Sequence, residues 1–292
     1  MSCLCVLFGV SRQSYYQRHE LDFERLVFRG FVIDYVREVR LQAPRMGYQK
    51  LFEMCKNYFG DKFTMGRDAF YHLLGENGLM LRMRRHKART THSDPSDTFY
   101  PNLIKGLTVT AANQVWVCDI TYVWTESGFC YLFLVTDLYS HRIMGWLLST
   151  ELKHKNAQEV LQQAIETADC PLSGLIHHSD RGVQYTSSDY MNLLGQYGIQ
   201  ASRTEHGDPL ENAVAERVNG ILKQEWLSLY TFDNLESVRK VLAPAIEFYN
   251  KQRPHASNDW LTPEQAYNRQ GVLKKRWMNY YPPHKGQTPV PE

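Results

Sequence analysis

Hydrophobic positions recur with two different periods along the chain, and the change comes near residue 100. Before it, apolar residues recur at helical spacing, which predicts helices over 22–40, 43–59 and 64–80. After it, runs rich in Val, Ile, Leu, Phe, Tyr and Trp predict strands over 113–124, 129–139 and 142–150, joined by short turns into an antiparallel meander. The pattern therefore predicts a helical front followed by a part built on a β-sheet.

Helices and strands alternate after the meander. Helical spacing predicts helices over 155–168, 187–198 and 210–230, and short apolar runs predict strands over 173–180 and 199–204. With the meander, these segments make an α/β core over 113–230 with a five-stranded mixed sheet flanked by helices. Trp116, Trp124 and Trp146 are expected to fill its interior. A polar linker over 93–112 precedes the core, and a helical extension with a tail over 231–292 follows it.

The front of the chain suggests contact with a polyanion. Residues 1–106 contain 17 Lys or Arg and 11 Asp or Glu, whereas the remaining residues contain 16 and 20, within a net charge of +2. The start, 1–20, reads as a partial helix-turn-helix in which Ser11 caps the second helix, although a plain capped surface helix fits equally well. The helical region 21–92 ends in a basic run, which is either a DNA contact or a solvated charge run at a domain edge. Its basic residues are Arg82, Arg84, Arg85, Lys87 and Arg89.

Other classes of protein are disfavoured. The sequence has no run of 18 apolar residues, so a membrane span is not expected. Its first residues lack the basic region and cleavage site of a signal peptide, and its six cysteines show no metal-ligand spacing. We therefore expect reduced thiols and a cytoplasmic protein.

Three acidic residues occupy positions that suggest chemistry. Asp119 lies inside the apolar strand "VWVCDITYV", where an ionised carboxylate is costly unless something pairs with it. Asp180 ends the strand 173–180, and Glu216 lies in the helix 210–230. If the two strands run parallel side by side, both aspartates meet, and Mg²⁺ or Mn²⁺ would relieve their repulsion. The alternative is that all three are ordinary acids at strand ends and on a helix.

The sequence segments around these acids resemble those of a known protein family. "NQVWVCDITYV", "HHSDRGVQYTS" and "ENAVAERVNGILKQE" resemble, in order, the three catalytic blocks of orfB-type insertion-sequence transposases, members of the DDE superfamily that includes retroviral integrases. The 35 residues between Asp180 and Glu216 match the spacing of that group. "FYNKQRPHASNDWLTPEQAY", residues 248–267, resembles the segment that follows the core in the same transposases. The resemblance extends from about residue 8 to residue 267.

The resemblance implies an RNase H-like core whose catalytic triad, Asp119, Asp180 and Glu216, binds two divalent metal ions, Mg²⁺ or Mn²⁺. It also implies DNA contacts near the triad, at His178, Arg181, Asn212 and Lys223, for each of which a packing or surface role is the alternative. In one departure, Glu211 stands where the family usually has Asp.

The implied function is metal-dependent cleavage of DNA at mobile-element ends, followed by strand transfer of the 3′-hydroxyl into target DNA. Two alternatives stay open: an inactive DNA-binding regulator derived from such a transposase, and a nuclease that cuts without joining. The implied partners are terminal repeats, target DNA and further copies of the chain on DNA. A further implied partner is an upstream reading frame with a helix-turn-helix, either separate or fused. The implied location is the bacterial cytoplasm, at the nucleoid.

Overall fold

The computed structural model describes residues 11–81, 100–168, 170–180, 182–204 and 212–276. The chain divides into two compact units, Met1–Lys87 and Ala88–Glu292. The predicted basic run 82–89 lies outside the described residues.

The first unit is helical. It consists of α2 (Arg12–Gln42), α3 (Tyr48–Phe59), the 3₁₀ turn η1 (Gly60–Lys62) and α4 (Arg67–Glu76). The Ser11 hydroxyl caps α2 as expected, accepting the backbone N–H of Ser14 at 3.0 Å. The helix then continues past residue 20 without a break, so two predicted elements form one helix. The core of this first unit is built from buried side chains of α2, α3 and α4, among them Val32, Val36, Leu51, Phe70 and Leu74.

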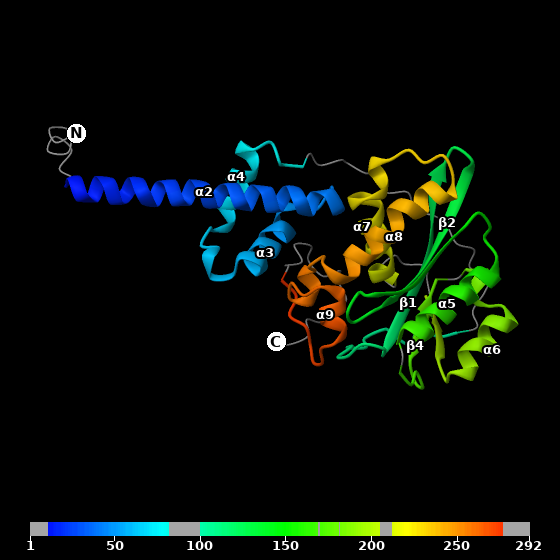
Figure 1. Cartoon of the computed structure of the whole chain (residues 1–292). Helices are drawn as coiled ribbons and strands as arrows, with labels where there is room; N and C mark the ends of the chain where they lie inside the picture. Colours follow the sequence, from blue (N-terminus) through cyan, green and yellow to red (C-terminus); the bar gives the residue numbers. More distant parts are fainter. Residues whose placement is uncertain (1–10, 82–99, 169, 181, 205–211, 277–292) are drawn as a thin grey trace, which may run out of the picture. The chain divides into compact units, whose positions relative to one another are not determined.

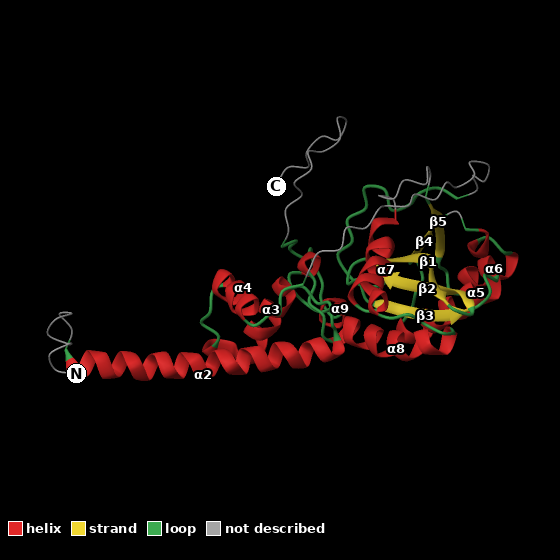
Figure 2. Ribbon diagram, turned by 90° about the horizontal axis from the view of Figure 1, so that it is seen from above, coloured by secondary structure: helices red, strands yellow, loops and turns green. Residues whose placement is uncertain are grey.

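The second unit contains the predicted sheet. The meander is β1 (Val115–Thr125), β2 (Gly128–Asp137) and β3 (Ile143–Ser149), and β4 (Ile176–Ser179) and β5 (Gln200–Arg203) complete it. The strand order is β3-β2-β1-β4-β5, with β4 parallel to β1 and β5 parallel to β4 (Figure 2). This confirms the five-stranded mixed RNase H-like sheet. Because β1 and β4 run in the same direction, the C-terminal half of β1 and the end of β4 point toward the same edge of the sheet.

Helices cover both faces of this sheet (Figures 1 and 2). One face carries α5 (His154–Ala168) and α6 (Ser188–Gln196), whereas α7 (Ala213–Glu225) packs on the other. The C-terminal part contains α8 (Leu235–Lys251) and α9 (Pro263–Tyr267), and the short 3₁₀ turns are η2 (Val183–Tyr185), η4 (Leu227–Leu229) and η5 (Ala256–Asn258). In the part of the chain that the structure describes, no helix has the length and apolar character needed to cross a bilayer.

The period of two along β1 decides which side chains enter which core. Trp116 and Cys118 point into the cluster under α5 and α6, and Val115 and Val117 point toward Ala215 of α7. Trp116 is fully buried, as predicted, and Trp146 is partly buried. The prediction for Trp124 was wrong: its side chain is 62% exposed, because it lies near the hairpin end, where the helices of that face do not cover the sheet.

Candidate active site

Asp119 lies on the α7 face of β1. Its position follows from the alternation that turns Val115 and Val117 toward α7, so that residue 119 faces the same way. One carboxylate oxygen accepts the side-chain amide of Asn219 on α7 at 2.7 Å, and the other accepts the N–H of Ile120 at 3.0 Å. Burial first and the charge of Asp180 second raise the pKa of Asp119 to about 7, although the hydrogen bond from Asn219 opposes the shift.

Asp180 follows β4 directly, and strand pairing brings it to Asp119. Parallel register places Ser179 opposite Cys118, so the next residue of each strand is an aspartate. Asp180 accepts the N–H of Gly182 at 3.0 Å. The residue is exposed, but its carboxylate is shielded on the protein side; this burial raises its pKa, and the Gly182 N–H and the charge of Arg203 oppose the shift.

Glu216 stands in the first turn of α7 and is exposed. Its charge also raises the pKa of Asp119, so it lies within electrostatic reach of the pair. Among the described residues, no three Asp, Glu, His or Cys side chains are close enough to enclose one metal ion as they stand. The structure therefore brings the two aspartates together and places Glu216 beside them in a more open arrangement.

Two further predicted residues lie next to the aspartates. The side-chain amide of Asn212 donates to the carbonyl of Cys118 at 3.0 Å, which ties the start of α7 to β1. The ammonium group of Lys223 lies 4.8 Å from the ring centre of Tyr122. Burial lowers the pKa of Lys223, and the charge of Asp119 opposes that shift, so this cation faces both the ring and the acidic site.

His178 is not available to DNA in this structure, which corrects the prediction for it. Its side chain is fully buried in the middle of β4, and its Nδ1 is 2.9 Å from the hydroxyl of Ser202 on β5. A ring enclosed between neighbouring strands packs the sheet and cannot touch a phosphate. Arg181 and Glu211 lie outside the described residues.

Sequence reasoning missed two polar side chains of this site, Asn219 and Arg203. Asn219 lies three residues after Glu216 on the same face of α7, and this helical spacing could have found it. Arg203 is paired in register with Ser179, so it reaches Asp180 from β5, and no signal in the sequence gives that register. Both side chains are almost completely buried. Within the described ranges, Oδ1 of Asn219 and Nε of Arg203 have no hydrogen-bond partner.

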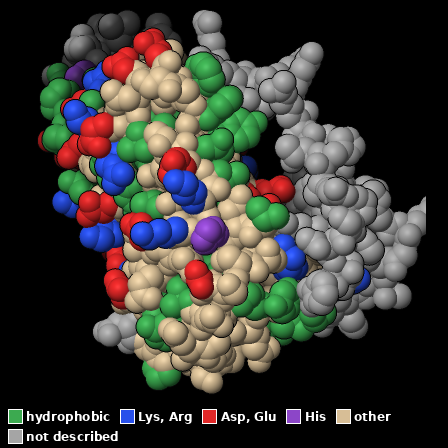
Figure 3. Space-filling model, turned by 90° about the vertical axis from the view of Figure 1, so that its right-hand side faces the viewer, with side chains coloured by type: hydrophobic (Ala, Val, Ile, Leu, Met, Phe, Trp, Pro, Cys, Tyr) green, Lys and Arg blue, Asp and Glu red, His purple; other side chains and the backbone are tan. Residues whose placement is uncertain are grey.

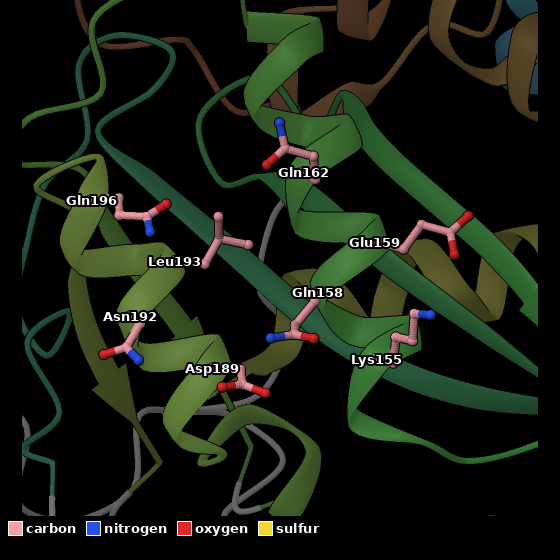
Figure 4. A pocket seen from close by; sticks show the side chains of 8 residues that line it. All are labelled: Lys155, Gln158, Glu159, Gln162, Asp189, Asn192, Leu193 and Gln196. Carbon is pink, nitrogen blue, oxygen red and sulfur yellow. The ribbon is translucent and has the colours of Figure 1, made fainter.

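The opposite face of the sheet carries a groove whose charged lining residues are Lys155, Glu159 and Asp189. It has a volume of about 540 Å³ and runs between α5 and α6, with mostly polar side chains such as Gln158, Gln162 and Asn192 (Figure 4). On that side of the molecule, Lys and Arg side chains are interspersed with Asp and Glu (Figure 3). A mixed charge of this kind gives no preference for a polyanion, so this groove is not part of the site.

Comparisons with family models and with related proteins point to the same family. Two models described as "Integrase core domain" match residues 109–209 and 197–263. The chain is 33% identical to the insertion element IS600 uncharacterized 31 kDa protein of Shigella sonnei, over 87% of this chain and 93% of that protein. It is 34% identical to the transposase for insertion sequence element IS904 of Lactococcus lactis, over 65% of this chain and 77% of that protein.

Solved integrase cores are similar at lower identity. The HTLV-2 integrase catalytic core domain in complex with magnesium is 20% identical, with a TM-score of 0.43 over 54% of this chain and 98% of that chain. The BIV integrase catalytic core domain is 23% identical, with a TM-score of 0.43 over 53% of this chain and 93% of that chain. On the evidence of the family models and the insertion-sequence relatives, the chain belongs to the DDE-type insertion-sequence transposases of the integrase superfamily.

Proposed function

We propose that the protein cuts DNA at the ends of a mobile element and joins the freed 3′-hydroxyl to target DNA. One observation supports this above the others: β1 pairs with β4, so Asp119 in β1 and Asp180 directly after β4 are neighbours whose like charges repel. Two carboxylates held together repel each other, and a divalent cation between them would relieve this repulsion. The same cation could assist a reaction at a phosphodiester.

Asp119, Asp180 and Glu216 are the residues that would hold divalent cations, two Mg²⁺ or Mn²⁺ ions. Their donors are all carboxylate oxygens, which these ions prefer, and the raised pKa of Asp119 is what such a group shows without a cation beside it. When bound, the ions would neutralise the acidic cluster and activate an oxygen nucleophile. Because Glu216 is exposed on the first turn of α7, its side chain can turn toward the pair without disturbing the core.

The remaining side chains of the site have positioning roles. Asn219 orients the Asp119 carboxylate through its amide group, and Asn212 aligns α7 on β1 through the Cys118 carbonyl. Lys223, a cation facing the acidic site, would hold a phosphate of the DNA strand. Arg203 offers a buried guanidinium beside Asp180 and keeps the segment after β4 near the site, with Nη2 3.5 Å from the Gly182 carbonyl.

The proposal extends to partners. The basic residues Arg82, Arg84, Arg85, Lys87 and Arg89, together with Arg181, would contact the DNA backbone. Further copies of the chain would assemble on DNA in the bacterial cytoplasm, because two element ends must be brought together. A helix-turn-helix supplied by an upstream reading frame would add recognition of the terminal repeat.

A cleavage assay tests the main proposal. Duplexes spanning the DNA on either side of the protein's own gene are incubated with the full chain and Mg²⁺, and nicks are mapped. Asp119→Asn should reduce the rate by more than about 100-fold, because it removes a carboxylate ligand. The control Glu159→Gln changes an exposed acid on α5, on the opposite face of the sheet, and should cut normally. Equal cutting by Asp119→Asn would refute the assignment of Asp119.

A second assay separates the alternatives. Pre-cut ends carrying a free 3′-hydroxyl are mixed with a target plasmid, and joined products are counted. Joining supports a transposase, whereas cutting without joining supports a nuclease on the same scaffold. DNA binding with neither reaction supports a regulator.

A further inference from the structure

Three aromatic side chains stand exposed at the end of the β1–β2 hairpin. We call them the aromatic ledge: Tyr122, Trp124 and Phe129, which are 49%, 62% and 48% exposed. Trp124 and Phe129 are direct partners across the two strands. The Phe129 ring meets both others edge to face, with centroid distances of 5.4 Å to Tyr122 and 4.7 Å to Trp124. Residues of this kind normally fill a core, so three together at a surface indicate a binding site.

The ledge is connected to the acidic site through one cation. The ammonium group of Lys223 lies over the Tyr122 ring, and the charge of Asp119 acts on the same group. Asp119 and Trp124 belong to the same strand, five residues apart, which corresponds to about 17 Å along β1. Five residues is an odd number, so the side chains of Asp119 and Trp124 lie on opposite faces of β1. A DNA strand with one phosphate near Asp119 would reach the ledge by crossing the edge of β1, where Lys223 of α7 contacts the Tyr122 ring.

The edge of β1 beside the ledge is open in the described part of the chain. The partner strand β4 pairs only with Val115–Cys118, so from Asp119 onward β1 pairs with β2 alone. Exposed aromatic rings bind nucleobases by stacking, and this is possible only where a base is unpaired and its face is free. Together with Lys223 for the phosphate, the ledge has the two components of a site for single-stranded nucleic acid.

From this arrangement we infer that Tyr122, Trp124 and Phe129 form a stacking platform for unpaired nucleobases of the DNA strand whose phosphate reaches Asp119. The inference deepens the proposed function and rests on it, since it specifies the form of the DNA substrate at the same site. It implies that the DNA end is opened next to the reacting phosphate.

Binding measured without metal tests the platform separately from catalysis. The full chain is titrated in EDTA against a fluorescein-labelled single-stranded oligothymidylate and against a duplex of equal length, with anisotropy as the readout. Trp124→Ala and Phe129→Ala should each weaken single-strand binding by about fivefold or more and leave duplex binding unchanged, because stacking needs a free base. Tyr197→Ala, at the end of α6 and 38% exposed, is the matched aromatic control and should bind as the wild type does.

Trp124→Phe provides a readout that a structural defect would not give. It retains a ring at the ledge, so its affinity should stay within about twofold of the wild type. The quenching of intrinsic fluorescence by the oligonucleotide should be lost, because the stacked indole is gone. Melting curves verify that each variant is folded, which is expected because both side chains are largely exposed.

Three results would overturn the platform. One is single-strand binding by Trp124→Ala and Phe129→Ala equal to that of the wild type. Another is an equal loss on single strand and duplex, which would make the ledge part of a general DNA surface. The third is unchanged DNA binding with a loss of self-association in sedimentation, which would make it a contact between copies. A wild-type chain that binds the single strand through the ledge but never cuts DNA would instead defeat only the proposed reaction.

Discussion

At the scale of single residues, the burial of Asp119 lowers the stability of the metal-free fold, while the same carboxylate belongs to the proposed active site. This carboxylate lies in a strand whose neighbours are core side chains, and among the described residues it accepts hydrogen bonds from the Asn219 amide and the Ile120 N–H. An acid inside an apolar strand made Asp119 a site candidate from the sequence pattern, whereas Asp180 and Glu216 became strong candidates only through the family resemblance of the segments around them. The sequence was insufficient for Arg203, since the register of β5 against β4 depends on how the whole sheet pairs.

Neutralising Asp119 should stabilise the metal-free protein. Folding raises its pKa from 3.8 to about 7, so between these pH values the folded state binds a proton that the unfolded chain has lost. Stability therefore falls as pH rises through this window, and the loss is complete above pH 7. Asp119→Asn removes that loss, and we expect its melting temperature in EDTA to exceed that of the wild type by several degrees at pH 8 and to match it near pH 4.

Calorimetry at both pH values measures this difference. Glu159→Gln, an exposed acid on α5, is the control and should melt like the wild type throughout. A wild type and Asp119→Asn that melt together at pH 8 would show that Asp119 is not strained. Added Mg²⁺ should stabilise the wild type and leave Asp119→Asn unaffected.

At the scale of elements, the local patterns were predictive and the long-range ones were not. Helical and strand periods located the meander and its following helices to within a few residues, and the cap at Ser11 was as expected. The burial of His178 and the exposure of Trp124 could not be read in the same way. The burial of one residue and the exposure of the other depend on which strands and helices cover each position. The hydrophobicity of a residue alone does not determine which elements cover it.

The contact between α5 and β3 requires the glycine at position 145. A Cβ atom there would lie 2.5 Å from the carbonyl oxygen of Val160 and 3.1 Å from the N–H nitrogen of Ala164, both in helix backbone. Gly145→Ala should therefore force the two elements apart and lower the free energy of unfolding by about 1–3 kcal/mol. Urea unfolding measures it.

The matched control for that substitution is Gly30→Ala. Gly30 lies inside α2 with no atom within 4 Å of the added methyl group, so alanine should stabilise the helix by about 0.5–1 kcal/mol. If Gly145→Ala proved as stable as the wild type, the close approach would not be a constraint on the fold.

A buried ion pair joins the end of α7 to the segment after α8. Arg253 donates two hydrogen bonds to Glu225, at 2.8 and 2.6 Å, and a third contact of 2.9 Å joins it to His255. Arg253→Ala would remove both of these hydrogen bonds from a buried carboxylate, and we expect a loss of about 3–5 kcal/mol in the free energy of unfolding. Chemical denaturation gives the value.

The exposed pair of Lys251 and Glu247 on α8 is the comparison. Lys251→Ala should leave the free energy of unfolding nearly unchanged, because an exposed pair contributes little. Equal effects of the two substitutions would mean that the buried pair does not hold these elements together.

At the scale of the whole molecule, two histidines, the buried His177 and the partly buried His141, set a limit on acid stability. Burial lowers the pKa of His177 from 6.5 to about 3 and that of His141 to about 4. The unfolded chain takes up these protons below pH 6.5 while the folded protein does not, so stability falls as the pH drops from 6.5 toward 4. The titration of Asp119 acts in the opposite sense over the same range, so it offsets part of this loss.

Replacing His141 tests this account. His141→Gln removes one of the two proton acceptors, so the variant should lose less stability than the wild type between pH 6.5 and pH 4.5. Melting temperatures across that range provide the comparison, with His154→Gln, an exposed histidine at the start of α5, as the control. Parallel curves for His141→Gln and the wild type would exclude a contribution from this residue.

The parallel pairing of β1 with β4 also determines when the site can form during synthesis. The meander contains Asp119 and consists of neighbouring segments, so it can fold soon after it leaves the ribosome. Asp180 joins it only after α5 and β4 have been made, and Glu216 only after α7. A nascent or prematurely ended chain would therefore contain a folded hairpin with its aromatic rings and no complete set of acids, so it could hold a DNA strand before it could cut one.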